Sequence, residues 1–470
     1  MHDLRTLLET HNQGHVLAYW DEISEDGREQ LVTQLRDLDW EQLDAWIEDA
    51  LAAESGANVP ASLEPAPYYP LIPETAEQID LYRKAEKRGR DLLGQGRIAA
   101  FTVAGGQGTR LGYDGPKGTY PISPVAGKTL FQLFAEGVAR AGEKYGVPIA
   151  WYIMTSPIND AATRAFFAEN AYFGLRAEDV TMFPQGTLPA IDPSGRLLLG
   201  AKDSLALSPN GHGGSLLALR DHGCLADMAK RGVDHMSYWQ VDNPLVYQFD
   251  PLFLGLHDLT GSDMSSRSLT KTGPFEKLGN FCLTDDGRCI IVEYSDMPDE
   301  LAEATDVDGR LRFRAGSPAI HVLRRAFIDR VTQGRLDLPI HRADKKVTCI
   351  GEGGITVAPT EPNAIKMETF IFDGLPLAEN PLILEGDRAE QFGPVKNVNG
   401  IDSAESCRQL LIERAARWLE QGGVPVPRRP DGTVNGEVEL SPRRFLGVDD
   451  VKAAASGLRP PAAEAEEYYG

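Results

Sequence analysis

The chain has 470 residues, of which 42% are hydrophobic and 25% are charged, a composition typical of a soluble globular protein with two or three domains. Its formal net charge of -22 argues against sequence-independent binding to DNA or RNA, which requires a basic surface. A local cluster of cations for a small anionic ligand remains compatible with this charge.

Residues 1–95 are predicted to be mostly helical. The stretches at 3–12, 24–53 and 75–96 each have apolar residues three or four apart with charges between them. The stretch at 54–75 is rich in proline and small residues, which predicts a loop between the helices.

Strands and helices alternate from about residue 96 to 385. Short apolar runs at 98–106, 149–156 and 235–243 predict buried strands, and the stretches at 129–146 and 159–174 have helical spacing. This alternation predicts an α/β fold with a mixed, mostly parallel sheet covered by helices. The predicted domains are thus a helical region at 1–95, an α/β domain at 96–385 and a small C-terminal domain at 386–470.

The C-terminal region has one clear helical pattern, at 402–423. The final stretch, 457–470, has small and charged residues around two prolines, and we predict a frayed end there.

Targeting signals are absent from the printed sequence. No apolar run approaches the ~20 residues of a membrane span, and the first residues lack a basic and then apolar signal pattern. The five cysteines have no CxxC spacing, which favours reduced thiols in the cytoplasm. We therefore expect a cytoplasmic protein with neither nucleic acid nor membrane as a partner.

A glycine-rich segment, "VAGGQGTRLGYDGPKG" at 103–118, follows the first predicted strand. Ligands of such sheets bind outside the carboxyl ends of the strands, and glycines let backbone N–H groups approach an anion closely. Arg110 and Lys117 would add full positive charges. The segment contains neither GxxxxGK[ST] nor GxGxxG, so it is neither a P-loop nor a dinucleotide fingerprint.

The whole run resembles the signature loop of the UTP-dependent sugar-1-phosphate uridylyltransferases, and is most similar to eukaryotic-type UDP-N-acetylglucosamine pyrophosphorylase. The resemblance implies that residues 96–385 form a Rossmann-like nucleotidyltransferase domain, which is catalytic and binds the nucleotide sugar. Further segments resemble the family in its order over about residues 75–445. They include "YIMTS", "FPQGTLPAI", "SPNGHGG", "QVDNPLV", "IIVEYSDM", "NAIKMETFIFD" and "GPVKN".

The resemblance implies a reaction between UTP and a sugar 1-phosphate that gives a UDP-sugar and pyrophosphate. An oxygen of the sugar phosphate attacks the α-phosphorus in line, and because that oxygen is already anionic, no general base is needed. The site must hold two anions together and neutralise the leaving group.

The resemblance also assigns residues. It implies catalytic contacts to phosphate from Arg110, Lys117 and Lys396, and a Mg²⁺ (or Mn²⁺) ligand in Asp242, which follows a strand and offers the oxygen ligands that Mg²⁺ prefers. The implied nucleotide-binding residues are Gly105, Gly106, Gln185, Gly186, Gly211 and His212. The implied sugar-binding residues are Gly279, Glu293, Ser317 and Lys366.

Two of these positions depart from the N-acetylglucosamine enzymes, which have Asn where this chain has His212 and Ser317. N-acetylglucosamine 1-phosphate is the first expectation for the sugar, with a UDP-glucose, UDP-galactose or broad-specificity enzyme as the alternative. A catalytically inactive nucleotide-sugar-binding regulatory protein is the alternative of another class. The retention of Arg110, Lys117 and Asp242 argues against it.

Overall fold

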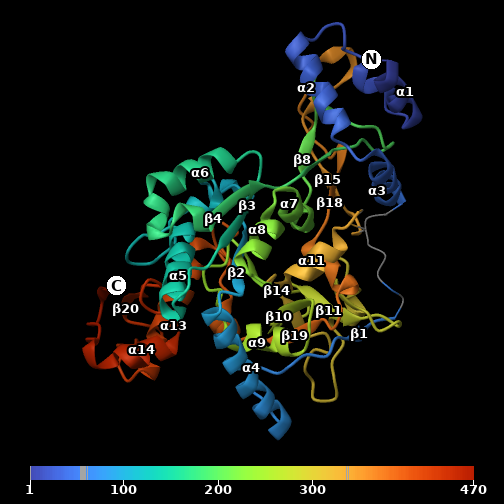
Figure 1. Cartoon of the computed structure of the whole chain (residues 1–470). Helices are drawn as coiled ribbons and strands as arrows, with labels where there is room; N and C mark the ends of the chain where they lie inside the picture. Colours follow the sequence, from blue (N-terminus) through green and yellow to red (C-terminus); the bar gives the residue numbers. More distant parts are fainter. Residues whose placement is uncertain (1, 53–59, 61, 335, 337) are drawn as a thin grey trace. The chain divides into compact units, whose positions relative to one another are not determined.

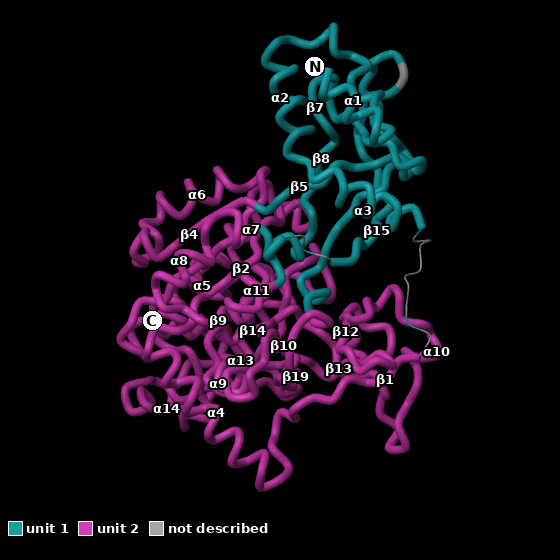
Figure 2. Tube along the Cα trace, turned by 45° about the vertical axis from the view of Figure 1, so that its right-hand side comes forward, with its two compact units in different colours: residues 1–61, 185–217, 331–374 teal, residues 62–184, 218–330, 375–470 magenta. Residues whose placement is uncertain are grey.

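The computed structural model describes residues 2–52, 60, 62–334, 336 and 338–470 (Figure 1). The chain forms two compact units (Figure 2). Unit 1 comprises Met1–Ala61, Gln185–Leu217 and Val331–Gly374, and unit 2 comprises Ser62–Pro184, Ala218–Arg330 and Leu375–Gly470. The three-part division predicted from composition, with limits at 95 and 385, stays a prediction.

Unit 2 is built on an 11-stranded sheet in the order β1-β11-β13-β10-β14-β9-β2-β3-β4, with β12 paired to β11 and β19 paired to β10. Strands β9, β2, β3 and β4 run parallel, whereas the pairs from β9 to β1 are antiparallel. The predicted mixed sheet is confirmed, and its parallel part is confined to these four strands and the β10–β19 pair. The strands are β1 (Glu64–Pro65), β2 (Ile98–Val103), β3 (Trp151–Thr155), β4 (Val180–Pro184), β9 (His235–Gln240), β10 (Met264–Thr270), β11 (Gly279–Leu283), β12 (Cys289–Val292), β13 (Ala315–Ser317), β14 (His321–Arg324) and β19 (Leu382–Glu385).

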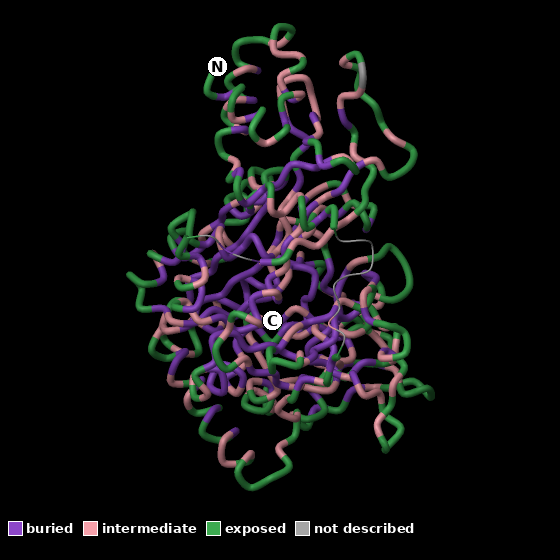
Figure 3. Tube along the Cα trace, turned by 90° about the vertical axis from the view of Figure 1, so that its right-hand side faces the viewer, coloured by how far each residue is buried: buried purple, intermediate pink, exposed green. Residues whose placement is uncertain are grey.

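The parallel strands are buried on both faces, which is why they are nearly continuous apolar runs in the sequence. Their large side chains form the core of unit 2, and Phe101, Trp151, Tyr152, Tyr238 and Trp239 are almost completely buried. Figure 3 shows the buried residues of the chain in purple. The predicted strands at 98–106, 149–156 and 235–243 are confirmed.

The helices of unit 2 begin and end at the residues that the sequence marks. Thr75 forms a capping box at the start of α4, Thr129 caps α5, and Gly146 takes a left-handed conformation after α5. The helices are α4 (Ala76–Gly94), α5 (Leu130–Tyr145), α6 (Asp160–Glu169), α8 (Cys224–Arg231), α9 (Pro251–Leu259), α10 (Asp299–Ala302), α12 (Arg388–Gln391), α13 (Ala404–Gln421) and α14 (Val448–Ala454). Two more, α7 (Ser215–Asp221) and α11 (Arg325–Val331), span limits between the units.

Helices α4 and α9 cross at very short range because each presents a glycine to the other's backbone. A Cβ on Gly89 would collide with the carbonyl of Pro251, and a Cβ on Gly255 would collide with the carbonyl of Ala85. This close packing requires glycine at both positions.

The predicted frayed end is wrong. Residues Ala465–Tyr469 form β21, which pairs in parallel with β20 (Gly436–Leu440). Tyr469 is buried, and the Tyr468 hydroxyl accepts a hydrogen bond of 2.6 Å from the buried Lys128 ammonium, which also lies 2.6 Å from the Glu136 carboxylate. The strand forms because it completes the pairing of β20 and a buried polar cluster.

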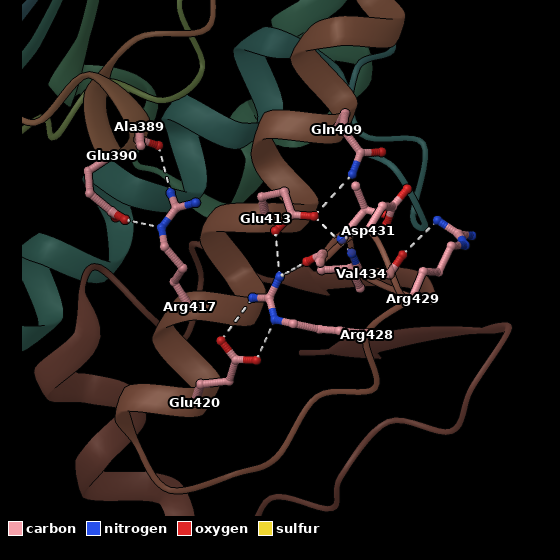
Figure 4. A network of polar contacts seen from close by, with 12 residues as sticks. Ala389, Glu390, Gln409, Glu413, Arg417, Glu420, Arg428, Arg429, Asp431 and Val434 are labelled. Carbon is pink, nitrogen blue, oxygen red and sulfur yellow. Dashed lines mark hydrogen bonds and ion pairs between the residues drawn. The ribbon is translucent and has the colours of Figure 1, made fainter.

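An arginine network fixes the segment that follows α13 (Figure 4). Arg428 pairs with Glu413 at 3.0 Å and with Glu420 at 2.8 Å, both on α13, and donates to the Gly432 carbonyl at 2.8 Å. The other oxygen of Glu413 accepts from the Val434 amide at 2.9 Å. The network holds the turn at 428–434 against the helix.

Unit 1 combines helices α1 (His2–Thr10), α2 (Glu25–Arg36) and α3 (Trp40–Ala52) with short strand pairs. The single helical pattern at 24–53 is interrupted, because the Asp39 carboxylate accepts a hydrogen bond from the Gln42 amide and starts a new helix. The strands are β5 (Thr187–Pro189), β6 (Leu199–Ala201), β7 (Ser204–Leu205), β8 (Leu207–Pro209), β15 (His341–Lys345), β16 (Cys349–Ile350), β17 (Thr356–Val357) and β18 (Ala364–Glu368).

Part of the predicted loop at 54–75 lies outside the described residues, at 54–59 and 61. Within the described part of the chain, no helix combines the length and the apolar character that crossing a membrane requires. The five cysteines are free and buried.

Candidate active site

The glycine loop follows β2 at the carboxyl edge of the parallel strands of unit 2. The Lys117 amide donates to the Gly106 carbonyl at 3.0 Å and the Gly108 amide to the Gly115 carbonyl at 2.9 Å, which folds the loop back on itself. Gly112 has a φ of 68° and Gly115 a φ of 153°, conformations that favour glycine. A Cβ on Gly106 would meet no atom within 4 Å, so the space beside this residue is open.

The loop carries a row of unused hydrogen-bond donors. In the described part of the chain, the backbone N–H groups of Gly105, Gly106 and Gln107 donate to no protein acceptor. Backbone amides are obligatory donors, and a row of them in a loop forms an anion-binding concavity. These free amides support the ligand contacts predicted for Gly105 and Gly106, which themselves stay predictions.

The two predicted cations of the loop differ in their surroundings. Arg110 is exposed and has no ion-pair partner among the described residues. The Lys117 ammonium is mostly buried and lies 3.5 Å from the Asp242 carboxylate, with 14% and 12% of the two side chains exposed. The structure thus brings together the predicted phosphate lysine and the predicted metal ligand.

A backbone hydrogen bond places Lys396 near Asp242, at the carboxyl edge of the parallel strands. The Val395 amide donates to the Asp242 carbonyl at 2.9 Å, so Lys396 directly follows a residue bonded to Asp242. Burial raises the pKa of the nearby Asp402 carboxyl, an effect that the positive charge of Lys396 opposes. The Lys117 ammonium and the backbone beside Lys396 therefore both adjoin Asp242 at the end of β9.

The predicted sugar residues in unit 2 also come together. Gly279 of β11 is the register partner of Ser317 of β13, and an ideal Cβ on Gly279 would lie 3.1 Å from a carboxylate oxygen of Glu293. The Ser317 hydroxyl accepts a weak hydrogen bond of 3.4 Å from the Ala319 amide. A carboxylate and a hydroxyl thus flank a glycine, an arrangement that suits hydrogen bonds to a sugar.

The remaining predicted residues lie in unit 1. Gln185 and Gly186 precede β5, and Gly211 and His212 follow β8. Because β5 and β8 pair in antiparallel fashion, these residues meet at one end of the strand pair. There the Asn210 amide donates to the Gly186 carbonyl at 3.1 Å. Gln185 is buried. Lys366 lies on β18 opposite Ala343.

The glycines of the "GHGG" turn have a packing cause that the sequence did not reveal. A Cβ on Gly211 would collide with the carbonyl of Thr369, and one on Gly213 would lie 2.7 Å from the Phe370 amide nitrogen. The chain itself, rather than open space, fills these positions. The nucleotide contact of Gly211 stays a prediction.

His212 is neutral in this fold. The Ile371 amide donates to its Nδ1 at 3.1 Å, which requires Nδ1 to be unprotonated and leaves the proton on Nε2. Burial and the neighbouring His341 lower the pKa of His212 to about 4. The ring stacks on Phe370 with centroids 5.0 Å apart, and His341 stacks on Phe370 as well, at 4.1 Å. His212 therefore offers one N–H donor and no charge.

Two residues with a structural bearing on the site were given no role by the sequence analysis. Asn243 anchors the end of β9 by donating to the Gln391 carbonyl at 2.8 Å and accepting from the Gly393 amide at 3.1 Å. Asn159 is described below. Only their position just after a predicted buried strand could have signalled them, because their partners are distant in the sequence.

The chain is similar to known proteins over most of its length. A family model described as UTP–glucose-1-phosphate uridylyltransferase matches residues 65–460. Human UDP-N-acetylhexosamine pyrophosphorylase-like protein 1 is 36% identical over 94% of this chain and 92% of its own length. UDP-N-acetylglucosamine pyrophosphorylase of Saccharomyces cerevisiae is 35% identical over 91% of this chain and 92% of its own length.

A solved structure shares the fold. The uridine diphosphate N-acetylglucosamine pyrophosphorylase of Trypanosoma brucei, determined in complex with an inhibitor, has a TM-score of 0.82 at 24% identity, covering 98% of this chain and 97% of that one. The chain belongs to the UTP–glucose-1-phosphate uridylyltransferase family. It is therefore a nucleotidyltransferase, and the predicted fold class and family are confirmed.

Proposed function

We propose that this protein transfers uridylate from UTP to an N-acetylhexosamine 1-phosphate, with N-acetylglucosamine 1-phosphate as the preferred acceptor. One oxygen of the sugar phosphate forms a bond to the α-phosphorus of UTP, the bond from that phosphorus to the bridging oxygen breaks, and pyrophosphate leaves. No proton transfer is needed because the attacking oxygen is already anionic. The row of unused amides at Gly105, Gly106 and Gln107 is the observation that carries the proposal.

The residues of unit 2 supply what this reaction requires. The free loop amides and Arg110 would bind UTP phosphates, and Lys117 and Lys396 would offset the repulsion between the two anionic substrates. Glu293 and Ser317 would accept from or donate to sugar hydroxyls. In unit 1, Gln185 offers a donor and an acceptor suited to uracil, and neutral His212 offers an N–H.

The donor set fits a divalent metal that arrives with its substrate. No group of three or more His, Cys, Asp or Glu side chains gathers among the described residues, so these residues show no all-protein cage. Mg²⁺ is usually held by one or two carboxylates and by substrate phosphates, and Asp242 supplies one carboxylate. When bound, Mg²⁺ would neutralise phosphate charge, and Asp242 would hold it.

The test is pyrophosphate release from UTP and Mg²⁺ with a panel of sugar 1-phosphates: N-acetylglucosamine, N-acetylgalactosamine, glucose and galactose. Release with the N-acetylated sugars is expected. Release with no member of the panel, despite measurable UTP binding, would favour the inactive nucleotide-binding alternative and reject the proposal.

The second candidate is a UDP-glucose, UDP-galactose or broad-specificity enzyme, which Ser317 favours. A side chain as short as serine, directly opposite Gly279, places no long amide beside the sugar. A site discriminates strongly only when a missing substrate group leaves a buried protein group unpaired. We therefore expect the wild type to use glucose 1-phosphate as well.

Ser317→Asn separates the two candidates. If one good hydrogen bond is gained, the kcat/KM ratio should move towards the N-acetylated sugar by ~1 kcal/mol, or about fivefold. A competition assay on equimolar sugar phosphates measures this ratio. Identical product ratios from wild type and variant would show that residue 317 does not set selectivity.

A further inference from the structure

Asn159 lies after β3, at the position just before α6, and its side chain is completely buried. Its amide nitrogen donates to the carbonyls of Ala104 at 2.9 Å and Gly106 at 3.2 Å. Its Oδ1 accepts from the Ser156 amide at 2.8 Å. A single side chain at the end of the neighbouring strand β3 therefore forms hydrogen bonds to two carbonyls of the glycine loop.

This contact determines where the loop amides point. In a trans peptide, the carbonyl of one residue and the N–H of the next point in opposite directions. Because Asn159 draws the carbonyls of Ala104 and Gly106 towards itself, the N–H groups of Gly105 and Gln107 point away from it. These belong to the amides that have no acceptor in the described part of the chain.

We propose that Asn159 is a positioning residue for UTP: it holds the glycine loop with its amides, and not its carbonyls, directed at the nucleotide phosphates. This inference rests on the proposed function. Without Asn159, the Ala104–Gly105 peptide could rotate and turn the negative end of its dipole towards the phosphates. The Gly106–Gln107 peptide would then be held by the Lys117 amide alone.

The position of Asn159 at a helix start does not explain its side chain. An asparagine that caps a helix accepts a hydrogen bond from an amide in the first turn, and Asn159 makes no such bond to α6. Both of its polar groups are directed elsewhere, to Ser156 and to the loop. The helix would begin here with another residue, whereas the Ala104 carbonyl would lose its side-chain donor and the Gly106 carbonyl would keep only the Lys117 amide.

Asn159 is also connected to Lys117. The Gly106 carbonyl accepts from both Asn159 and the Lys117 amide, the latter at 3.0 Å. This shared acceptor links the amide row to the backbone of the lysine proposed for phosphate binding. A displaced Gly106 carbonyl would therefore disturb both.

Asn159→Asp isolates the proposed role. The aspartate keeps the size of the side chain and an oxygen for the Ser156 amide, but it cannot donate to the two carbonyls and would repel them. We expect the KM for UTP to rise by about 10- to 100-fold, the range that two lost hydrogen bonds span. The KM for the sugar phosphate should change by less than about threefold, because that substrate does not contact the loop amides.

Asn170→Asp is the matched control, since Asn170 lies exposed at the other end of α6 and its side-chain amide donates to the Phe166 carbonyl of the same helix. Its UTP KM should equal that of the wild type. Asn159→Ser, which keeps one donor, should give an intermediate UTP KM and serves if Asn159→Asp does not fold.

Calorimetric titration of UTP and hydrogen exchange of residues 104–108 complete the test. Weaker UTP binding and faster exchange in Asn159→Asp, with an unchanged melting temperature, would support the inference. An unchanged UTP KM, or equal rises in both KM values with a lower melting temperature, would overturn it. A wild type that binds UTP without releasing pyrophosphate would defeat the proposed function alone, because UTP binding and exchange still report on Asn159.

Discussion

At the scale of single residues, Lys117 and Asp242 form a pair in which the lysine is expected to bind phosphate and the aspartate a divalent cation. Their charged atoms lie 3.5 Å apart, longer than the 2.7–2.9 Å of a tight charge-assisted hydrogen bond. The ammonium therefore partly neutralises the charge of the buried carboxylate without forming a tight hydrogen bond to it. Phosphate oxygens would compete for Lys117, and a cation would compete for Asp242.

Lys117→Ala should reduce kcat/KM by about 10²–10³, because the loss of a charge-assisted contact to the transition state costs about 2.7–4 kcal/mol. The fold should persist, since Lys117 makes its backbone hydrogen bond to Gly106 whatever its side chain. Steady-state kinetics and circular dichroism measure the two effects. Lys87→Ala, which removes an exposed lysine of α4, is the control and should be silent. Near wild-type turnover in Lys117→Ala would contradict the phosphate role.

Asp242→Asn should weaken the response to Mg²⁺. The amide keeps the shape of the side chain but removes the charge that holds the cation. We expect the Mg²⁺ concentration at half-maximal turnover to rise at least about tenfold, as measured by pyrophosphate release across a Mg²⁺ titration. Asp114→Asn, which neutralises an exposed aspartate of the glycine loop, should shift that midpoint little. An unaltered midpoint in Asp242→Asn would exclude this carboxylate as the ligand.

At the scale of elements, the α4–α9 crossing depends on having no side chain at two positions. Gly255→Ala should lower the free energy of unfolding by about 3 kcal/mol, because the added methyl group meets a rigid carbonyl. This cost of overpacking exceeds the ~1 kcal/mol by which alanine favours a helix over glycine. Urea unfolding measures it. Gly94→Ala is the control, because its Cβ would meet nothing within 4 Å at the end of α4. Equal stability of both variants would mean that the helices simply move apart.

The elements that the sequence predicted correctly are those whose signal is local. Strands β2, β3 and β9 are continuous apolar runs, and α4 and α5 carry threonine caps at their first turns. Strand β21 was missed because "AEEYY" is half charged, and its pairing with β20 depends on residues about 30 positions earlier. The second helix start at Asp39 did have a local capping signal, which the continuous apolar spacing concealed.

The residues of the candidate site also fall into two groups, those with a local sequence signal and those without one. The loop, its cations and Asp242 follow strands and could be predicted from that order. The register of Gly279 with Ser317, the packing cause of the "GHGG" glycines and the grip of Asn159 all join residues distant in sequence, so only the folded chain reveals them.

At the scale of the whole molecule, buried neutral histidines should make stability sensitive to acid. Burial, assisted by His235, lowers the pKa of His257 well below 6.5, and burial lowers that of His235 although Asp258 opposes it. Below pH 6.5 the unfolded chain binds protons that the folded chain does not. The free energy of unfolding should therefore fall by up to about 1.4 kcal/mol per pH unit for each such histidine.

Urea unfolding at pH 7.5, 6.5 and 5.5 measures this loss. The carboxylate beside His235 does not contribute in this range: the hydrogen bond from His235 holds the pKa of Asp258 below its usual value, so its stabilising effect disappears only at much lower pH. His257→Gln should flatten the profile. A wild-type stability that is constant from pH 7.5 to 5.5 would contradict the prediction.

The parallel pairing of β20 with β21 has a consequence for biosynthesis. During translation, β20 has no partner until Tyr469 has been made, and until then the ammonium of Lys128, synthesised some 340 residues earlier, lacks the Tyr468 hydroxyl. The last step in folding this part of unit 2 must therefore follow the emergence of residue 469 from the ribosome. A nascent chain stalled before that point would hold an exposed strand edge, a known starting point for aggregation.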